Sequence, residues 1–253
     1  MKILIGNTGL VGQTLKKNIK FDFEFNTSNI HTYEHIVKDG CELWLSCLPA
    51  TKWLVNQNIK KDLSNIDVIM DVISGKKYKS IVLISTIDVY CDSPNQSDES
   101  YNPNFSKFSY GTNRLLFEHM IGEYVQTEKL KIYRLPALFN NKIKKNVLYD
   151  LIHDNNVNQI DGNSYFQWYN LDNLHQLIED TFDSDRKVLN VFTEPIKTED
   201  IVKLFPQHLD KIQYRNNSVV YDYRTNSSDT GYIQDKESVL KEIEDLVNEI
   251  SVK

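Results

Sequence analysis

The feature that most constrains this chain is a glycine-rich turn close to its N-terminus. Residues 2–5 form a short apolar run, and Gly6, Gly9 and Gly12 follow it at three-residue spacing, ahead of a credible helix from residue 13. The chain has only 9 glycines, so three at this spacing indicate a backbone requirement. A strand, a glycine turn and a helix in this order predict an α/β domain whose first helix directs free N–H groups toward an anion.

Each glycine of this turn has its own predicted role. The first permits the tight turn, the second lets the backbone approach a pyrophosphate, and the third lets the helix pack closely on the strand. The predicted dinucleotide contacts, made mostly through the backbone, are Gly6, Gly9, Leu10, Val11 and Gly12. A tight strand-to-helix turn without a ligand is the alternative.

Further apolar runs predict the rest of the sheet. The runs at 43–47 and 81–85 are each followed by helical spacing, and residues 21–25 and 131–135 supply two more strand candidates. Continuous apolar strands that alternate with helices are typical of parallel sheets covered on both faces. The predicted fold class is therefore α/β, a Rossmann-type, mostly parallel sheet with helices on both faces and a small C-terminal substrate lobe.

The expected organisation has two parts. Residues 1–136 form the dinucleotide-binding core, and residues 137–253 add sheet-completing segments, the small lobe and a terminal helix. The segment 26–41 has room for one short helix only, so the first half of the sheet should be smaller than in a full doubly wound domain. Apolar residues recur at three- and four-residue steps over 235–250, which predicts the terminal helix.

Charge and composition bear on partners and compartment. Acidic residues outnumber basic ones by 35 to 29, and this net charge of -6 argues against a nucleic-acid partner. No apolar stretch approaches the ~20 residues that span a bilayer, and the N-terminus lacks the pattern of a secretory signal. The 3 irregularly spaced cysteines favour reduced thiols and no metal site. A cytoplasmic protein without membrane partners is therefore expected.

Two patterns carry a resemblance to a known family. The spacing Gly-x-x-Gly-x-x-Gly resembles the turn of the extended short-chain dehydrogenase/reductase superfamily, in its NAD-dependent epimerase/dehydratase group. In addition, Thr86 ends an apolar run, and Tyr110-Gly-Thr-Asn-Arg114 opens a helix further on, which is similar to the superfamily's strand-end Ser/Thr followed by Tyr-x-x-x-Lys. The resemblance covers roughly residues 1–180. It implies NAD or NADP as cofactor and a small-molecule substrate, a nucleotide sugar.

The resemblance also implies catalytic roles. Tyr110 would be the general acid/base, Thr86 would hydrogen-bond the reacting oxygen, and Arg114 would bind the nicotinamide ribose and lower the pKa of Tyr110. Residues four apart share a helix face, and a fixed cation favours tyrosinate. Arginine stands in place of the usual lysine, and its planar guanidinium group is larger and differently oriented. The alternative is a packing tyrosine at the helix start with a surface arginine.

Three more cofactor contacts are implied by the resemblance. They are Asn26 after the second strand, Leu48 after the third, and Leu135 in an Arg-Leu-Pro segment. Because the second strand ends with neither an acid nor an arginine, the choice between NAD and NADP stays open. An asparagine that often contacts substrate in the superfamily is Ala137 here.

Two functions remain open at this point. The first is an NAD(P)-dependent epimerase or keto-reductase that acts on a sugar nucleotide, with Tyr110 exchanging a proton as hydride moves between carbon and nicotinamide. The second is a non-catalytic NAD(P)-binding or sensing protein of the same fold, which Arg114 and Ala137 favour. Asp88 is expected to be a capping or loop carboxylate, and Ile87 beside it argues against a 4,6-dehydratase.

The resemblance further implies a homodimer. Members of the superfamily commonly pair through the helix that carries the tyrosine, which is expected here from about Ser106 to Tyr124. The mixed apolar surface expected for this contact consists of Leu115, Leu116, His119, Met120 and Glu123.

Overall fold

The computed structural model describes residues 1–103 and 107–251. The chain divides into two compact units. The first unit contains Met1–Pro94, Tyr101–Arg134 and Asn173–Leu189, and the second contains Asn95–Ser100, Leu135–Asp172 and the chain from Asn190 onward. Each unit thus combines three stretches of sequence, whereas the sequence suggested a single division after residue 136. The difference arises because the chain returns at Asn173–Leu189 to add a helix and a strand to the first unit.

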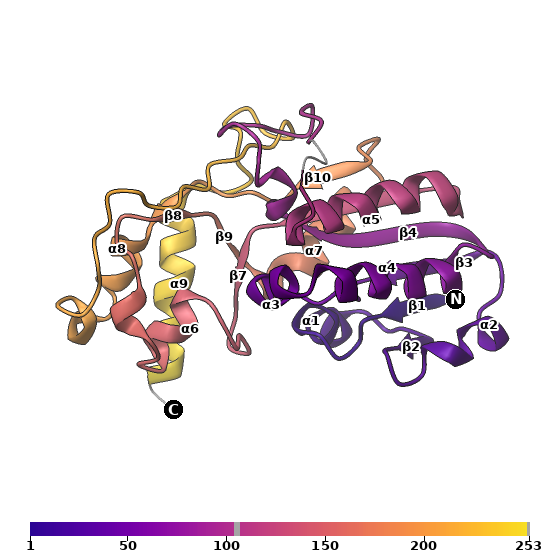
Figure 1. The fold of residues 1–253 in the computed structure, drawn as a ribbon, viewed down its shortest axis with the longest axis horizontal. Coiled ribbons are helices and arrows are strands. Elements are labelled where there is room, and N and C mark those ends of the chain that lie inside the picture. The colour runs from indigo at the N-terminus through magenta and orange to yellow at the C-terminus, as the bar shows by residue number, and fades with distance from the viewer. Residues whose placement is uncertain (104–106, 252–253) are drawn as a thin grey trace. The chain divides into compact units, whose positions relative to one another are not determined.

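A mostly parallel sheet forms the centre of the first unit (Figure 1). Its strands are β1 (Lys2–Ile5), β2 (Phe23–Phe25), β3 (Cys41–Leu45), β4 (Lys77–Thr86), β5 (Gln126–Thr127), β6 (Leu130–Leu135) and β10 (Val188–Asn190). The order is β10-β6-β4-β3-β1-β2, and β5 pairs with β4. The pairs β1–β2, β1–β3, β3–β4 and β4–β5 are parallel. The predicted fold class is confirmed.

Helices pack against this sheet (Figure 1). They are α1 (Leu10–Asn18), α2 (Tyr33–Ile36), α3 (Lys52–Gln57), α4 (Ile59–Ile73), α5 (Tyr110–Tyr124) and α7 (Leu174–Thr181), with the 3₁₀ turns η1 (Ile30–Thr32) and η2 (Ile87–Tyr90). α4 contacts α5, and α1 contacts α7. Only η1 and the short α2 lie between β2 and β3, as the sequence predicted.

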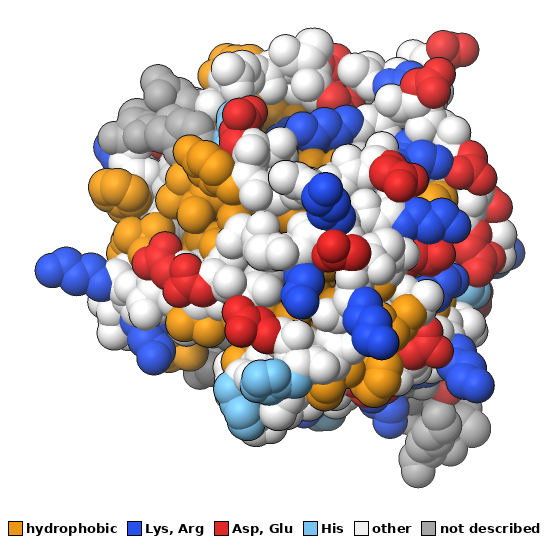
Figure 2. Space-filling model, turned by 90° about the vertical axis from the view of Figure 1, so that its right-hand side faces the viewer, with side chains coloured by type: hydrophobic (Ala, Val, Ile, Leu, Met, Phe, Trp, Pro, Cys, Tyr) orange, Lys and Arg blue, Asp and Glu red, His pale blue; other side chains and the backbone are white. Residues whose placement is uncertain are grey.

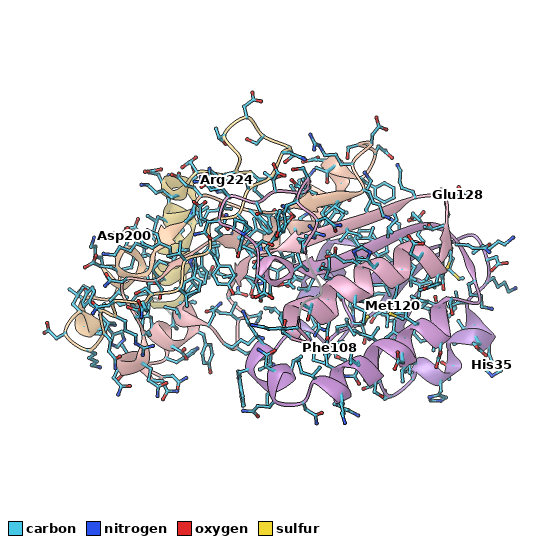
Figure 3. All side chains as sticks on the ribbon, turned by 45° about the horizontal axis from the view of Figure 1, so that its top comes forward. His35, Phe108, Met120, Glu128, Asp200 and Arg224 are labelled. Atoms are coloured by element: carbon cyan, nitrogen blue, oxygen red, sulfur yellow. The ribbon has the colours of Figure 1, made fainter. Side chains whose placement is uncertain are left out.

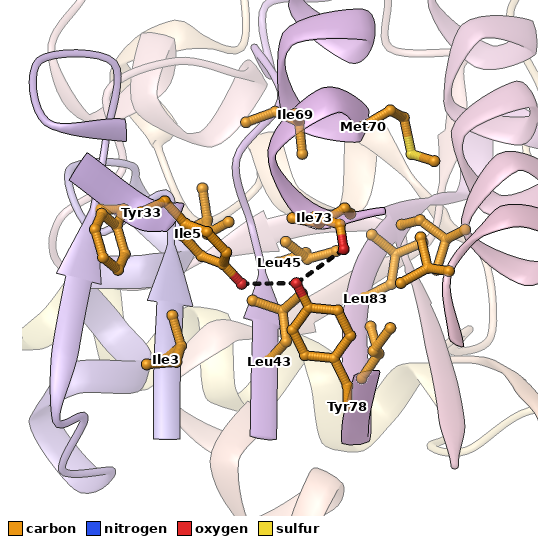
Figure 4. Packing of buried hydrophobic residues seen from close by; sticks show 14 of the residues in the cluster. Ile3, Ile5, Tyr33, Leu43, Leu45, Ile69, Met70, Ile73, Tyr78 and Leu83 are labelled. Carbon is orange, nitrogen blue, oxygen red and sulfur yellow. Dashed lines mark hydrogen bonds between the residues drawn. The ribbon is translucent and has the colours of Figure 1, made fainter. Parts of the chain in front are cut away.

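The alternation of side chains along the strands builds the core. Residues such as Ile5 and Leu45 on the strands join Ile73 of α4 in one buried cluster. Figure 4 shows a polar pair inside this cluster: the hydroxyls of Tyr33 and Tyr78 lie 2.9 Å apart, and Tyr78 donates to the carbonyl of Ile73 at 3.0 Å. Burial raises the pKa of both tyrosines, so both remain protonated donors.

The strand order reverses at β1, next to the glycine turn where the site was expected. β2 lies on one side of β1 and β3 on the other, so the connections leave in opposite directions at this point. In open α/β sheets, ligands bind outside the carboxyl ends of strands at such a switch point. Because β1, β3 and β4 are parallel, the residues that follow them, including Gly6, Ser46 and Thr86 at the strand ends, lie at one edge of the sheet.

The second unit has a separate small core. β7 (Ala137–Phe139) pairs with β9 (Trp168–Asn170), and β8 (Tyr165–Phe166) pairs with β11 (Ile196–Lys197). Its helical segments are α6 (Val147–Ile152), η3 (Val157–Gln159), η4 (Leu171–Asn173), α8 (Thr198–Val202), η5 (Pro206–His208) and α9 (Lys236–Ser251). Trp168 and one face of α9, including Val239 and Ile243, are buried in this core. The predicted terminal helix is confirmed.

The surface of the described chain is mixed in charge. On the face that Figure 2 shows, Lys and Arg side chains are interspersed with Asp and Glu. Within residues 1–103 and 107–251, no helix is both long enough and apolar enough to cross a membrane. The same ranges contain no cluster of three His, Cys, Asp or Glu side chains that could hold a metal ion.

The helix expected at the dimer contact is largely buried within the chain itself. α5 begins at Tyr110, and Ser106 lies outside the described residues. Leu115 is 1% exposed and packs inward, so its assignment to the contact surface was wrong. Met120 lies between α5 and α4 (Figure 3) and packs partly against the core. His119 and Glu123 are exposed, as a contact surface requires.

Candidate functional site

Two of the three turn glycines are required by the packing of the protein itself. Gly6 follows β1 with φ of 103°, a conformation that L side chains rarely adopt, and an added Cβ would overlap the backbone carbonyl of Ser46. An added Cβ on Gly12 would overlap the carbonyl oxygen of Gly6. These two glycines therefore allow α1 and the end of β3 to pack closely against the turn.

Gly9 is different, because the protein itself does not require a glycine there. It has ordinary extended backbone, with φ of -72° and ψ of 161°, and an added Cβ would lie no closer than 3.6 Å to its nearest neighbour, the Gly6 carbonyl oxygen. Gly9 is exposed at the N-cap of α1, and no side chain caps this helix. The space over Gly9 and the N–H groups that follow fit an approaching pyrophosphate.

The end of β2 lies beside this turn. The amide of Asn26 donates to the side-chain oxygen of Asn7 at 3.1 Å, and Asn7 donates to the carboxylate of Glu24 at 3.0 Å. Burial raises the pKa of Glu24, but hydrogen bonds from Lys16 and Asn7 outweigh this effect and hold the pKa below its usual value. Glu24 is thus an anion close to the turn. The sequence analysis missed it because it precedes the last residue of the strand.

Residues after β3 line the other side of the turn. The hydroxyl of Ser46 donates to the carbonyl of Gly6 at 3.4 Å. Leu48 is half-buried against the core of the first unit, and Pro49 offers its carbonyl to the side chain of Arg114 at 2.6 Å. The segment after β3 therefore links the glycine turn to the residues around Tyr110.

Thr86 and Tyr110 come together as the sequence pattern suggested. Thr86 is the last residue of β4, and Tyr110 is the first residue of α5, which Ser109 caps through a reciprocal capping box. The start of α5 lies so close to η2 that a Cβ on Gly111 would overlap the carbonyl of Asp88. The Thr86 hydroxyl accepts from the backbone N–H of Asp88 at 3.2 Å, and it lies close enough to Tyr110 to act on the pKa of the phenol.

The environment of Tyr110 keeps its phenol protonated. Burial raises the pKa of Tyr110 and is the largest effect. The cation of Arg114 and the hydroxyl of Thr86 act in the opposite direction, while the nearby carboxylate of Asp88 raises the pKa further. Because the net shift is upward, the phenol of Tyr110 is protonated at neutral pH.

Arg114 is buried rather than at the surface. Its guanidinium carbon lies 4.5 Å from the centre of the Tyr110 ring, and its side chain is 6% exposed. The guanidinium donates to both carboxylate oxygens of Asp62 in α4, at 2.7 and 3.1 Å. The alternative of a surface arginine is therefore wrong, and the arginine has a partner that the sequence analysis did not identify.

Two polar residues on α3 and α4 also lie against the start of α5. Asn56 accepts a hydrogen bond from the backbone N–H of Tyr110 at 2.8 Å. Asp62 occupies a buried position on the face of α4 that carries Ile66 and Ile69, where a carboxylate is unexpected. A buried acid within an apolar helix face was the sequence signal that could have identified Asp62.

Asp88 has a specific partner. Its carboxylate forms an ion pair with Lys52 at the start of α3, and the Asp88 side chain is 14% exposed. Asp88 was expected to be a capping or solvated loop carboxylate; the solvated alternative is wrong, and the residue lies in the first turn of η2. The carboxylate belongs to the polar surroundings of Tyr110, whose pKa it raises.

Leu135 is the remaining residue for which a cofactor contact was implied. It is the last residue of β6, is 3% exposed and belongs to the second unit. Ala137, in the position of the family's substrate asparagine, begins β7.

Comparison with known proteins gives a fold match only. No family model matches the chain, and no curated protein matches it. MoeE5 in complex with UDP-glucose and NAD has a TM-score of 0.74 at 12% identity, with 100% of this chain and 99% of that chain covered. UDP-glucuronic acid 4-epimerase from Bacillus cereus, bound to a fluorinated UDP-sugar and NAD, has a TM-score of 0.72 at 15% identity, with 99% of this chain and 99% of that chain covered. dTDP-4-dehydrorhamnose reductase from Yersinia enterocolitica has a TM-score of 0.71 at 13% identity, with 98% of this chain and 99% of that chain covered. Over its whole length the chain therefore has the fold of the NAD-dependent epimerase/dehydratase and reductase structures, as the sequence resemblance implied.

Proposed function

We propose that the protein is an NAD(P)-dependent enzyme that epimerises or reduces a sugar nucleotide. One observation carries the proposal: the neighbouring residues Thr86 and Tyr110 and the open turn at Gly9 lie at the same carboxyl edge of one parallel sheet. An anion-binding turn and a proton donor at one edge are the two protein elements that hydride transfer to a carbonyl requires. The printed ligands of the similar structures, UDP-glucose, a UDP-sugar acid and NAD, agree with this class.

The turn residues would hold the dinucleotide. Backbone N–H groups at Leu10 and Val11 would bind the pyrophosphate over the open space at Gly9, and Asn26 would lie toward the adenosine ribose. Asn26 is neutral, so either dinucleotide is a candidate. When bound, the dinucleotide would supply or accept the hydride.

The residues of this chain would handle the proton. Tyr110 would donate its phenolic proton to the oxygen of a carbonyl as that oxygen gains negative charge, and Thr86 would hydrogen-bond the same oxygen. Arg114 would stabilise the tyrosinate that remains. The same proton donor serves the reduction of a keto sugar and the reduction step that completes an epimerisation, so both reactions stay within the proposal.

Two measurements test this function. Calorimetric titration with NAD(H) and NADP(H) identifies the cofactor, and the absorbance of the reduced nicotinamide then reports hydride transfer to UDP-4-keto sugars or from UDP-glucose. Tyr110→Phe should leave dinucleotide affinity nearly unchanged and lower turnover by about 10²–10⁴-fold. If Tyr110→Phe turns over at the wild-type rate, the acid/base assignment is wrong.

The second candidate is a protein that binds the dinucleotide without turnover. The observation that favours it is the capture of Arg114 by Asp62, because a neutralised cation lowers the pKa of a tyrosine less effectively than a lone one. Tight dinucleotide binding with no change in nicotinamide absorbance for any of these sugars would support this candidate.

A further inference from the structure

We propose that Asp62 is a positioning residue, which aims Arg114 at Tyr110 and allows an arginine to stand where the family pattern has lysine. This inference rests on the proposed function and deepens it. It assigns a role to a buried carboxylate that neither binds the dinucleotide nor touches Tyr110.

The contacts around Asp62 form a closed buried group. The carboxylate accepts from both terminal nitrogens of Arg114, and one of its oxygens also accepts from the amide of Asn113 at 2.8 Å. The side chain of Asp62 is 2% exposed. Arg114 donates in addition to the carbonyl of Pro49, so two separate segments fix the plane of the guanidinium.

This geometry is specific to arginine. A guanidinium has five N–H groups in a rigid fork, and the bonds to Asp62 and Pro49 use three of them. The same guanidinium also lies over the ring of Tyr110, with its central carbon 4.5 Å from the ring centre. A lysine has three N–H groups on one atom at the end of a flexible chain, so it cannot bridge these partners in the same way.

The carboxylate therefore determines which cation works at position 114. With Arg114→Lys, the buried carboxylate would attract the ammonium group toward α4 and away from Tyr110, because a buried charge must be paired. Neutralising the acid with Asp62→Asn would release the ammonium. The two substitutions should therefore compensate each other, whereas a purely structural role for Asp62 predicts that their effects add.

Asp62→Asn preserves the shape of this site but removes the counter-ion of the buried Arg114 guanidinium, so a loss of stability is expected and the unfolding midpoints are measured alongside affinity. The replacing amide has the shape of the carboxylate and can still accept from Asn113. The side-chain oxygen of Asn113 is buried and has no hydrogen-bond partner among the described residues, so it can accept from the new amide. Asp71→Asn, at an exposed position on the same helix, is the matched control.

The test measures affinity for NAD+ and NADP+ by calorimetry, together with unfolding midpoints. Asp62→Asn and Arg114→Lys should each weaken binding of the preferred dinucleotide about tenfold, and the double variant should return to within about threefold of wild type, as expected for coupled neighbours. Arg114→Lys combined with Asp71→Asn should stay as weak as Arg114→Lys alone.

Other results would refute either the positioning role of Asp62 or the proposed function. Additive losses in the double variant, or an Asp62→Asn protein that binds like wild type, overturn the positioning role while the proposed function stands. A folded wild-type protein that binds neither NAD+ nor NADP+ overturns the proposed function, and the positioning role fails with it.

Discussion

Gly9→Ala should separate dinucleotide binding from folding. The added Cβ would lie 3.6 Å from the nearest protein atom, and the backbone at Gly9 suits alanine. Alanine is a poorer N-cap than glycine by up to about 1 kcal/mol, but it restricts the unfolded chain and so recovers about 0.4–1 kcal/mol. The free energy of unfolding should therefore change by less than about 1 kcal/mol, which corresponds to a shift in midpoint of at most about 4 °C.

The same methyl group should strongly weaken binding. It would lie at the N-cap of α1, in the open space beside the N–H groups of the first turn, so the pyrophosphate would be displaced from these N–H groups. The loss of two hydrogen bonds to a charged group, at about 1.5 kcal/mol or more each, amounts to about 3 kcal/mol. Dinucleotide affinity should fall about 100-fold, and Gly9→Val should have at least this effect.

Gly12→Ala is the matched control with the opposite pattern. Its Cβ would overlap the Gly6 carbonyl oxygen, a backbone atom that cannot move aside. Overpacking of this kind costs about 1–3 kcal/mol, so the unfolding midpoint should fall by about 3–10 °C.

The assay is calorimetric titration with NAD(H) and NADP(H), combined with thermal unfolding of the three proteins. A Gly9→Ala protein that binds the dinucleotide with wild-type affinity would refute the assignment of this turn. A Gly9→Ala protein that loses as much stability as Gly12→Ala would refute the steric reasoning.

Three further predictions concern stability and assembly. In the wild-type protein, both carboxylate oxygens of Glu118 bind the buried guanidinium of Arg134. Glu118→Gln removes this counter-ion and should destabilise the protein by about 3–5 kcal/mol in chemical unfolding; an unchanged unfolding midpoint would contradict this. The raised pKa values of Tyr33 and Tyr78 mean that their contribution to stability is complete below the ordinary phenol pKa of about 10 and is lost as pH rises above it; unfolding titrations from pH 8 to 11 should show this loss, and Tyr33→Phe should reduce it. Light scattering at micromolar concentration should give the mass of a homodimer, and a monomeric mass would count against the expected contact through α5.

Local sequence patterns predicted the elements around the glycine turn well. The turn, the short β2–β3 connection and the convergence of Thr86 with Tyr110 depend on residues close together in sequence or on the common edge of parallel strands. Such features follow from periodicity and turn chemistry, so they can be inferred before any tertiary contact is known. The return of Asn173–Leu189 to the first unit depends on long-range packing, and no local pattern signals it.

The side-chain partners of the site could not be inferred in the same way. The sequence shows an arginine where lysine is usual, and on that basis it allowed a surface residue or a lysine-like cation. The structure instead pairs Arg114 with Asp62, 52 positions earlier, and with the carbonyl of Pro49, 65 positions earlier. Position 114 and position 62 therefore have to be interpreted together. The arginine can replace lysine because Asp62 orients its guanidinium, and Asp62 can be buried because the arginine compensates its charge. A departure from a family motif is evidence of lost activity only after its partners are known, which is why the double variant at these two positions tests the site more directly than either single substitution.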